Sequence, residues 1–193
     1  EPIGLPGEQL YASRFMGNRA YIITFRVTDP LYVLDLSDPL DPEILGELKI
    51  DGYSEYLHPI SENLLLGVGK DAVPDESNGF ADFGRGAWYQ GVKLSLIDVT
   101  DPTNPREADK VILGKRGTDS TALYTHHGLT GLKVNDSYRI AIPVRLHAET
   151  TQSTGSIRPS TFYQYSNTGL HRFEIDINNQ TIGQLPALIV NNQ

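Results

Sequence analysis

One segment of the sequence recurs three times, and this repetition constrains the fold more than any other feature. Two clear copies, residues 31–42 and 94–105, share an apolar run followed by Asp-x-x-Asp-Pro-x-x-Pro, and a fainter third copy covers residues 173–179. A second shared segment precedes each copy: residues 11–25 align without gaps with 55–69, and 124–144 is the third counterpart. A chain that repeats one short unit stacks supersecondary units against one another.

Each unit predicts four short strands separated by Gly, Pro, Asn and Asp. The strands are expected at 10–16, 19–26, 31–36 and 43–50 in the first unit, at 54–60, 63–69, 92–99 and 106–113 in the second, and at 122–133, 138–145, 169–177 and 181–190 in the third. No window shows a sustained apolar period of about 3.6 residues, so the chain is expected to be all-β.

The strands differ in burial in a regular order. The second strand of each unit is almost continuously apolar, as in residues 64–68, which requires cover on both faces. The fourth strand mixes in charge, as in residues 43–50, which suits an outer edge. This order predicts a β-propeller type of architecture with four-stranded antiparallel blades. A single partial-propeller domain is expected over residues 1–193, with three blades at about 8–50, 54–113 and 121–190.

Several stretches carry a family resemblance. They are Arg14-Phe-Met-Gly-Asn-Arg-Ala-Tyr, Asp35-Leu-Ser-Asp-Pro, Gly46-Glu-Leu-Lys-Ile, Tyr56-Leu-His-Pro and Leu94-Ser-Leu-Ile-Asp-Val-Thr-Asp-Pro. In order and spacing, over most of residues 8–145, they resemble the secreted prokaryotic C-terminal β-propeller domains, a family distantly akin to WD40 repeats. The resemblance implies the fold and an exported location, whether secreted, periplasmic or at the cell surface, and it implies no particular activity. Residues 147–168 form an insertion in the pattern, and Asn179 replaces the second Asp of the repeat.

The composition narrows the classes of partner. The chain has 24 acidic against 16 basic residues and no cysteine. An acidic chain without a basic cluster does not suit nucleic acid, and its longest apolar runs are far shorter than the roughly 20 residues of a membrane span. The absence of cysteine excludes disulfides and a cysteine nucleophile. Because the chain begins at Glu1 with no initiator Met and no apolar signal region, we expect a processed or excised piece of a longer protein.

The Asp-Pro motif permits two interpretations. Asp35, Asp38 and Asp41 place three carboxylates close together, as a metal site would. However, Asp before Pro closes tight turns through bonds to its own backbone, and the second copy has Asn104 where the first has Asp41. The motif is therefore interpreted as the turn between the third and fourth strands.

Basic and imidazole side chains recur on the expected first strands, which line the central channel of a propeller. They are Arg14, His58, His126 and His127. We expect a structural, hydrogen-bonding role for these axial residues. The alternative is a site in which the histidine nitrogens hold Zn, Cu or Ni, although no His-x-His or His-x-x-Glu-His spacing supports it.

Two long insertions, residues 70–92 and 146–168, connect the second and third strands of the second and third units. These loops open on the same face of a propeller, so we expect them to lie side by side. Aromatic and acidic side chains in such loops suit a binding surface, and the alternative is that they are spacers or cap the core. The candidate ligand-binding residues are Asp71, Asp75, Asp82, Trp88, Tyr89, His147, Tyr163 and Tyr165. The acidic residues of the first insertion could ligate calcium, but their spacing departs from an EF-hand loop.

The sequence favours a non-catalytic, exported binding or scaffold module that presents the two loops to a glycan, a peptide or a protein. No nucleophile elbow, phosphate loop or dinucleotide motif is present, and no cofactor is required. The rival hypothesis is a metal-binding site or metal-dependent enzyme that uses the axial histidines. A partial ring also leaves two sheet faces uncovered, so we expect apolar surface there, covered by a second copy of the chain or by missing blades of its parent.

Overall fold

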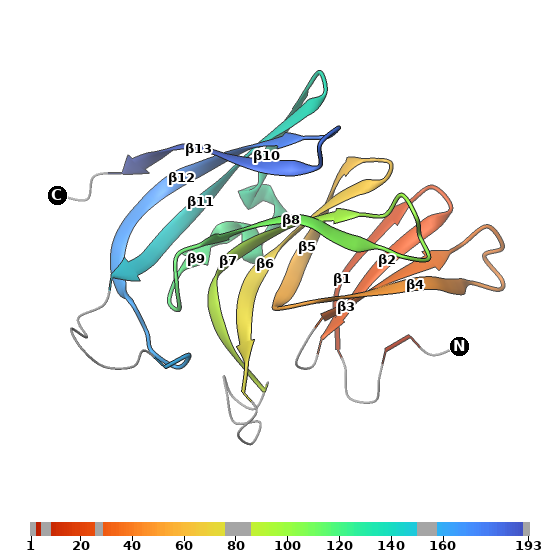
Figure 1. Ribbon diagram of the computed structural model, residues 1–193, viewed down its shortest axis with the longest axis horizontal. Helices are drawn as coiled ribbons and strands as arrows, with labels where there is room; N and C mark the ends of the chain where they lie inside the picture. The colour runs from red at the N-terminus through yellow and green to blue at the C-terminus, as the bar shows by residue number, and fades with distance from the viewer. Residues whose placement is uncertain (1–2, 5–8, 26–28, 76–85, 150–157, 191–193) are drawn as a thin grey trace.

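Three antiparallel sheets follow one another along the chain, each built from consecutive strands (Figure 1). The computed structural model describes residues 3–4, 9–25, 29–75, 86–149 and 158–190. The first sheet contains β1 (Gln9–Met16), β2 (Arg19–Phe25), β3 (Asp29–Asp35) and β4 (Glu43–Ile50). The second contains β5 (Tyr53–Ser61), β6 (Leu64–Pro74), β7 (Ala87–Asp98) and β8 (Arg106–Leu113). The third contains β10 (Thr130–Val134), β11 (Ser137–Glu149), β12 (Gln164–Asp176) and β13 (Thr181–Val190), and the short β9 (Asp119–Ser120) pairs with β11. The expected all-β class with three four-stranded antiparallel blades is confirmed.

The three sheets share one strand register. In each sheet, the first residue of the second strand pairs with the first Asp of the repeated motif: Arg19 with Asp35, Leu64 with Asp98, and Ser137 with Asp176. This common reference point makes every position of one sheet comparable with a position of the other two.

The hydrophobic core lies between the sheets, in two separate layers. Alternate residues of β6 serve the two layers: Leu65 packs with the first sheet, whereas Leu66 and Val68 pack with the third. Facing them from the third sheet are Ile142 and Phe173. The continuous apolar run of β6 is thus explained by cover on both faces, as expected, whereas the described parts of β2 and β11 pack against another sheet on one face each.

The Asp-Pro motif forms the turns between the third and fourth strands. Asp35 Oδ1 accepts hydrogen bonds from the backbone N–H of Ser37 at 2.8 Å and from its hydroxyl at 2.6 Å. Asp98 makes the same pair of bonds with Thr100, and Asp176 accepts from the backbone of Asn178 and Asn179. These bonds hold the pKa of each carboxyl below its usual value; for Asp98 they do so against the opposing effect of burial. The turn interpretation is confirmed in all three copies.

The strand expected at residues 122–133 is wrong over most of its length. Two 3-10 turns, η1 (Thr121–Leu123) and η2 (His126–Gly128), precede β10. Ser120 caps η1 by accepting a bond from the N–H of Ala122, and Gly128 passes so close that a Cβ there would lie 2.6 Å from the same nitrogen. The local capping and this close approach fold the segment into turns in place of a strand.

The boundaries of the two insertions also need correction. Strands β6 and β7 pair as far as Pro74 and Ala87, and β11 and β12 as far as Glu149 and Gln164. Much of each expected loop is therefore a strand extension, and both extensions reach the same end of the molecule, the lower end in Figure 1.

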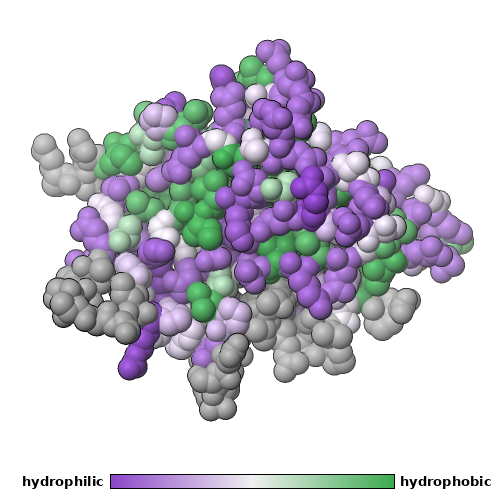
Figure 2. Space-filling model, in the orientation of Figure 1, coloured by the Kyte–Doolittle hydropathy of each residue, from purple (hydrophilic) through white to green (hydrophobic). Residues whose placement is uncertain are grey.

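On the outside, apolar side chains gather in separate groups between polar ones on the face that Figure 2 shows. Phe15 and Leu132, on the two sheet faces that no other sheet covers, are 66% and 65% exposed. Within the described ranges, no helix has the length and hydrophobicity needed to cross a membrane.

Candidate functional site

The connections of the second and third sheets meet at the lower end of the molecule (Figure 1). Gln90, on β7, donates a hydrogen bond from its side-chain amide to the carbonyl of Pro159, which precedes β12, at 2.9 Å. The segment between β8 and β9, residues 114–118, lies between the two connections: the backbone N–H of Tyr163 bonds to the carbonyl of Arg116 at 3.0 Å. The expectation that the two connections lie side by side therefore holds for their described parts.

Arg116 lies at the centre of the contacts at this end of the molecule. Its side chain is buried, with 6% of the residue exposed, and its guanidinium lies 5.0 Å from the ring centre of Trp88 and 4.3 Å from that of Phe162. It also donates a hydrogen bond to the backbone carbonyl of Tyr89 at 3.2 Å. We call Trp88, Arg116 and Phe162 the Arg116 stack. A cation held against two aromatic rings contributes cation–π attraction and fixes both rings on a rigid base.

Glycine makes the close approach of this segment possible. Gly114 and Gly117 have φ values of 67° and 109°, which side-chain-bearing residues rarely adopt. A Cβ on Gly117 would also lie 2.9 Å from the imidazole of His147. Thr118 completes the contact by donating from its hydroxyl to the carbonyl of His147 at 3.0 Å.

His147 positions the chain that leads into β12. Its Nδ1 lies 2.8 Å from the carbonyl oxygen of Tyr163, and because a carbonyl only accepts, this nitrogen carries the proton. The ring packs edge-on against Tyr165 at 5.9 Å, and the guanidinium of Arg145 lies 5.6 Å from the centre of the same tyrosine ring. Sequence-predicted residues of the second insertion are thus brought together around one histidine.

Tyr89 belongs to a row of tyrosines that continues towards the first sheet. Its ring centre lies 4.8 Å from that of Tyr53, which in turn lies 5.7 Å from Tyr11. Burial, with a smaller contribution from Glu55, raises the pKa of Tyr53 far above its usual value. Tyr89 therefore packs against the buried Tyr53, behind the Arg116 stack.

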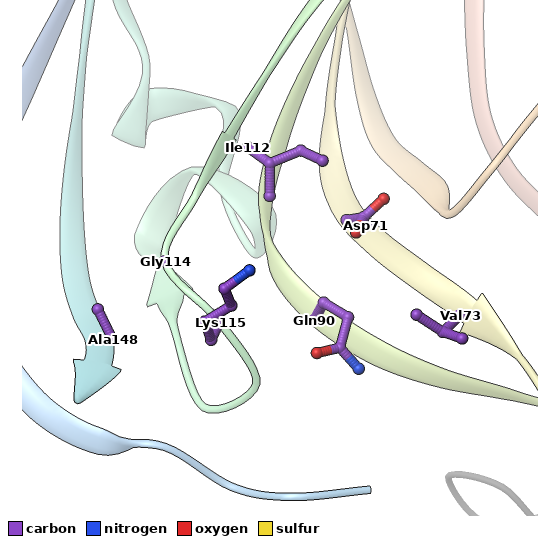
Figure 3. Close-up of a pocket in the computed structure, with 7 residues that line it drawn as sticks. All are labelled: Asp71, Val73, Gln90, Ile112, Gly114, Lys115 and Ala148. Atoms are coloured by element: carbon purple, nitrogen blue, oxygen red, sulfur yellow. The ribbon is translucent and has the colours of Figure 1, made fainter. Parts of the chain in front are cut away.

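A pocket of about 430 Å³ lies beside the Arg116 stack (Figure 3). Its lining residues come from β6, β7, β8, the 114–118 segment and β11: they are Asp71, Val73, Gln90, Ile112, Gly114, Lys115 and Ala148. Burial raises the pKa of Asp71, although Lys93 and Lys110 oppose the shift. The pocket offers a carboxyl group, an amide and an ammonium group among three apolar side chains, which suits a polar ligand.

The acidic residues of the first insertion do not converge. Asp71 lines the pocket, the backbone N–H of Asp75 bonds to the carbonyl of Gly86 at 2.9 Å, and Asp82 lies outside the described residues. In the parts of the chain that the structure describes, no three His, Asp or Glu side chains are arranged to hold a metal ion.

The axial residues form a second cluster, in which tyrosine mediates most of the contacts. The hydroxyl of Tyr56 lies 3.1 Å from Nδ1 of His58, and that of Tyr138 lies 2.8 Å from Nε2. The ring of Tyr56 also stacks on His126 at 5.8 Å and lies 5.4 Å from the guanidinium of Arg14.

His126 and His127 therefore lie on a 3-10 turn, where a strand was expected, and their rings are 4.5 Å apart. Burial, reinforced by Arg14, lowers the pKa of His58. Since a tyrosine hydroxyl engages each ring nitrogen of His58, this histidine would have to give up a hydrogen bond to bind a metal.

Sequence reasoning missed Arg116, Gln90, Tyr56 and Tyr138. The signal for Arg116 was present: it lies in Gly-Lys-Arg-Gly, residues 114–117, at a link between two units, and such links open on the same face as the insertions. Tyr56 lies in the Tyr56-Leu-His-Pro stretch of the family resemblance, which assigns it no role, and Tyr138 carries no motif that marks it.

Two archaeal proteins are similar in sequence to part of this chain. It is 50% identical over 104 residues to Uncharacterized protein MJ1554 of Methanocaldococcus jannaschii, and 46% identical over 120 residues to an uncharacterized protein of Archaeoglobus fulgidus. These matches cover 54% and 62% of this chain but only 14% and 16% of the two relatives. The relatives are thus several times longer than the region they share with it.

Among solved structures, cobalt-substituted Synechocystis ACO matches over 95% of this chain and 40% of its own, at 14% identity and a TM-score of 0.44. The Beta propeller domain family matches residues 3–185, nearly the whole chain. Together with the three stacked four-stranded sheets, this match means that the chain belongs to the β-propeller domain family.

Proposed function

We propose that this domain is a non-catalytic binding module that recognises a glycan at the Arg116 stack and the pocket beside it. The observation that carries the proposal is the clamping of Trp88 and Phe162 onto the buried Arg116. A β-propeller fold is compatible with such a role, because rigid sheets support loops that bind.

The chemistry of the pocket favours a sugar among the partners considered. Asp71 and Gln90 can accept hydrogen bonds from hydroxyl groups, and Lys115 and Gln90 can donate them. Phe162 is 69% exposed, so its ring offers an apolar surface on which the face of a pyranose can lie. A peptide or a protein is the alternative partner of the same surface, and a chain that no polysaccharide retains would favour it.

An exported location is part of this proposal, because the family resemblance implies it and a glycan ligand suits it. Metal-dependent chemistry at the axial histidines has less support, since Tyr56 and Tyr138 already engage His58.

The test is retention of the purified chain by a panel of neutral and acidic polysaccharides in affinity electrophoresis, followed by titration of any hit. The changes Phe162→Ala and Trp88→Ala should weaken binding at least about tenfold. Phe15→Ala is the matched control, because Phe15 is 66% exposed but lies on the first sheet, and it should leave binding unchanged. Lack of retention by every polysaccharide, or equal losses for Phe15→Ala and Phe162→Ala, would overturn the proposal.

A further inference from the structure

The uncovered face of the third sheet differs in chemistry from the equivalent faces of the other two. In the common register, the pair Tyr21–Val33 of the first sheet corresponds to Leu66–Leu96 of the second and to Arg139–Glu174 of the third. The pair next along corresponds in the same way: Ile23–Leu31, Val68–Leu94 and Ala141–Arg172. In the first two sheets all eight of these side chains are apolar and at most 1% exposed, because the next sheet covers them. In the third sheet, three of the four equivalent positions are charged.

Apolar side chains surround these charges. Leu132 pairs with Arg139 across the sheet, and Leu170 pairs with Leu188, so all of these residues share the uncovered face. Leu132 is 65% exposed, Leu188 56% and Leu170 37%. Leucines around charged groups are typical of an interface in which an apolar contact is combined with ionic pairing.

A pocket of about 340 Å³ lies between the two arginines of this face. Its lining includes Leu132, Arg139, Ala141, Arg172, Glu174 and Leu185. Arg172 is held in place by two hydrogen bonds from its guanidinium to the carbonyl of Pro186, at 3.0 and 2.7 Å. By contrast, Arg139 makes one long contact, 3.4 Å, with Glu174 and is 55% exposed. One guanidinium is therefore pre-oriented, and the other can turn towards an incoming carboxylate at little cost.

We propose that this face binds a β-sheet surface that carries carboxylates, and that it excludes a purely apolar one. The sheet shape follows from continuity: both interfaces within the chain are sheet against sheet, and the third face repeats their register. The carboxylates follow from charge complementarity: an apolar partner would bury the guanidinium of Arg172 against a carbonyl alone, and that of Arg139 with only its long contact to Glu174. A second copy of this chain fits less well, because the uncovered face of its first sheet presents the exposed ring of Phe15 and the carboxylate of Glu47, which is already paired with Lys49 at 3.6 Å.

The probe is a cyclic β-hairpin peptide that displays alternating Glu and Leu on one face, labelled for fluorescence anisotropy, with a counterpart in which Gln replaces every Glu. The full chain should bind the Glu peptide at least tenfold more tightly than the Gln peptide. The variants R172Q and R139Q should each weaken binding of the Glu peptide about tenfold. R158Q should not, because the exposed Arg158 lies in the connection before β12 and not on this sheet face. Equal binding of the two peptides would overturn the proposal, as would preferential binding of single-stranded DNA or anionic vesicles.

Size-exclusion chromatography with light scattering tests whether this face excludes a purely apolar sheet surface. The unmodified chain should not self-associate through this face, and the triple variant R139L/R172L/E174L, which restores the apolar pattern of the second sheet, should do so. A dimer of the unmodified chain that R172Q dissociates would contradict the inference, because a second copy of the chain would then be the occupant. Circular dichroism of each variant shows that its fold is retained.

Discussion

The Nε2 atom of His58, in the second sheet, lies 2.8 Å from the hydroxyl oxygen of Tyr138, the second residue of β11 in the third sheet. This hydrogen bond joins residues 80 positions apart across the interface between two sheets. A neutral imidazole has one donor and one acceptor nitrogen, so His58 donates to one of its two tyrosines and accepts from the other.

Removing one hydroxyl from this cluster should weaken the interface. Tyr138→Phe deletes the hydrogen bond and leaves a ring nitrogen of His58 without its partner, so we expect the free energy of unfolding to fall by about 1 kcal/mol. Urea unfolding followed by circular dichroism measures the change. Tyr165→Phe removes the hydroxyl of an exposed tyrosine and should cost clearly less; similar losses for the two variants would contradict the assigned role of Tyr138.

Acid should destabilise the fold through its buried histidines. His171 is 6% exposed, and no hydrogen-bond partner lies near either ring nitrogen within the described residues. Burial lowers the pKa of His171, and burial together with Arg14 lowers that of His58. Because the folded-state pKa lies below the unfolded value of about 6.5, the stabilisation is fully present above pH 6.5 and is lost as the pH falls through the folded pKa.

The measurement for this prediction is urea unfolding at a series of pH values from 7.5 to 5. His171→Leu should reduce the slope of stability against pH below about 6.5, since it removes one group that takes up a proton on unfolding. His127→Leu is the control, because His127 is exposed. An unchanged slope in His171→Leu would show that His171 takes up no extra proton on unfolding.

The repeated motif made the architecture predictable, and the physical reason lies in particular residues. Asp35, Asp98 and Asp176 bond the backbone two residues further on, so each local sequence specifies its own turn and needs no distant partner. The alternation of apolar positions on β6 likewise reports directly on the two layers that cover it. The strand prediction at residues 122–133 failed over its first part. There, the Ser120 cap and the close backbone approach of Gly128 fold the chain into turns, and the hydrophobic pattern does not reveal either feature.

The candidate site was only partly predictable. Trp88 and Tyr163 were identified as loop residues, but Arg116, which bonds or stacks with both loops, belongs to a third segment. Its role depends on distances between segments far apart in the chain, and a single sequence does not contain them. The same holds for Tyr138, whose partner is set by the packing of two sheets.

A buried ion pair should be among the most sensitive contacts of the second sheet. The ammonium of Lys93, 3% exposed, lies 2.8 Å from Oε1 of Glu107, which also accepts a short bond from Ser95. Burial opposes the ionisation of Glu107, but hydrogen bonds from Lys93 and Ser95 outweigh it and hold its pKa below the usual value. Glu107→Gln leaves the buried ammonium without its counter-charge, so we expect a loss of about 3 kcal/mol at neutral pH.

The control for this variant is Glu174→Gln, whose carboxylate pairs at 3.4 Å with an exposed arginine and should cost less than about 1 kcal/mol. The stabilisation from Glu107 is present above its unfolded pKa and is lost as the pH falls through its lower folded pKa. The two variants should therefore differ at pH 7 and converge in strong acid. Equal losses at pH 7, measured by urea unfolding, would mean that the buried pair contributes no more than the exposed one.

Glycine in β6 reflects a close approach of β5. A Cβ on Gly69 would collide with the carbonyl oxygen of Tyr53 and lie 2.7 Å from Cα of Ser54. Since backbone atoms cannot rotate away, Gly69→Ala should push the two strands apart and cost about 3 kcal/mol. Gly183→Ala is the matched control on β13, where the nearest atom would be 3.5 Å away, and its melting temperature should not fall. A melting temperature of Gly69→Ala equal to that of Gly183→Ala would contradict the collision.

The single tryptophan makes the Arg116 stack observable without a label. The chain contains one Trp, residue 88, so tryptophan emission, excited at wavelengths that the ten tyrosines do not absorb, reports on this site alone. Arg116→Lys keeps the positive charge but removes the planar guanidinium that lies over the rings of both Trp88 and Phe162. We therefore expect the emission of Trp88 to shift to longer wavelength and its quenching by acrylamide to increase, because water gains access to the indole. Arg106→Lys is the control, because this exposed arginine pairs with Asp98 in a turn between strands, and it should leave both signals unchanged. If Arg116→Lys gave the same spectrum as the unmodified chain, the guanidinium would not shield the indole.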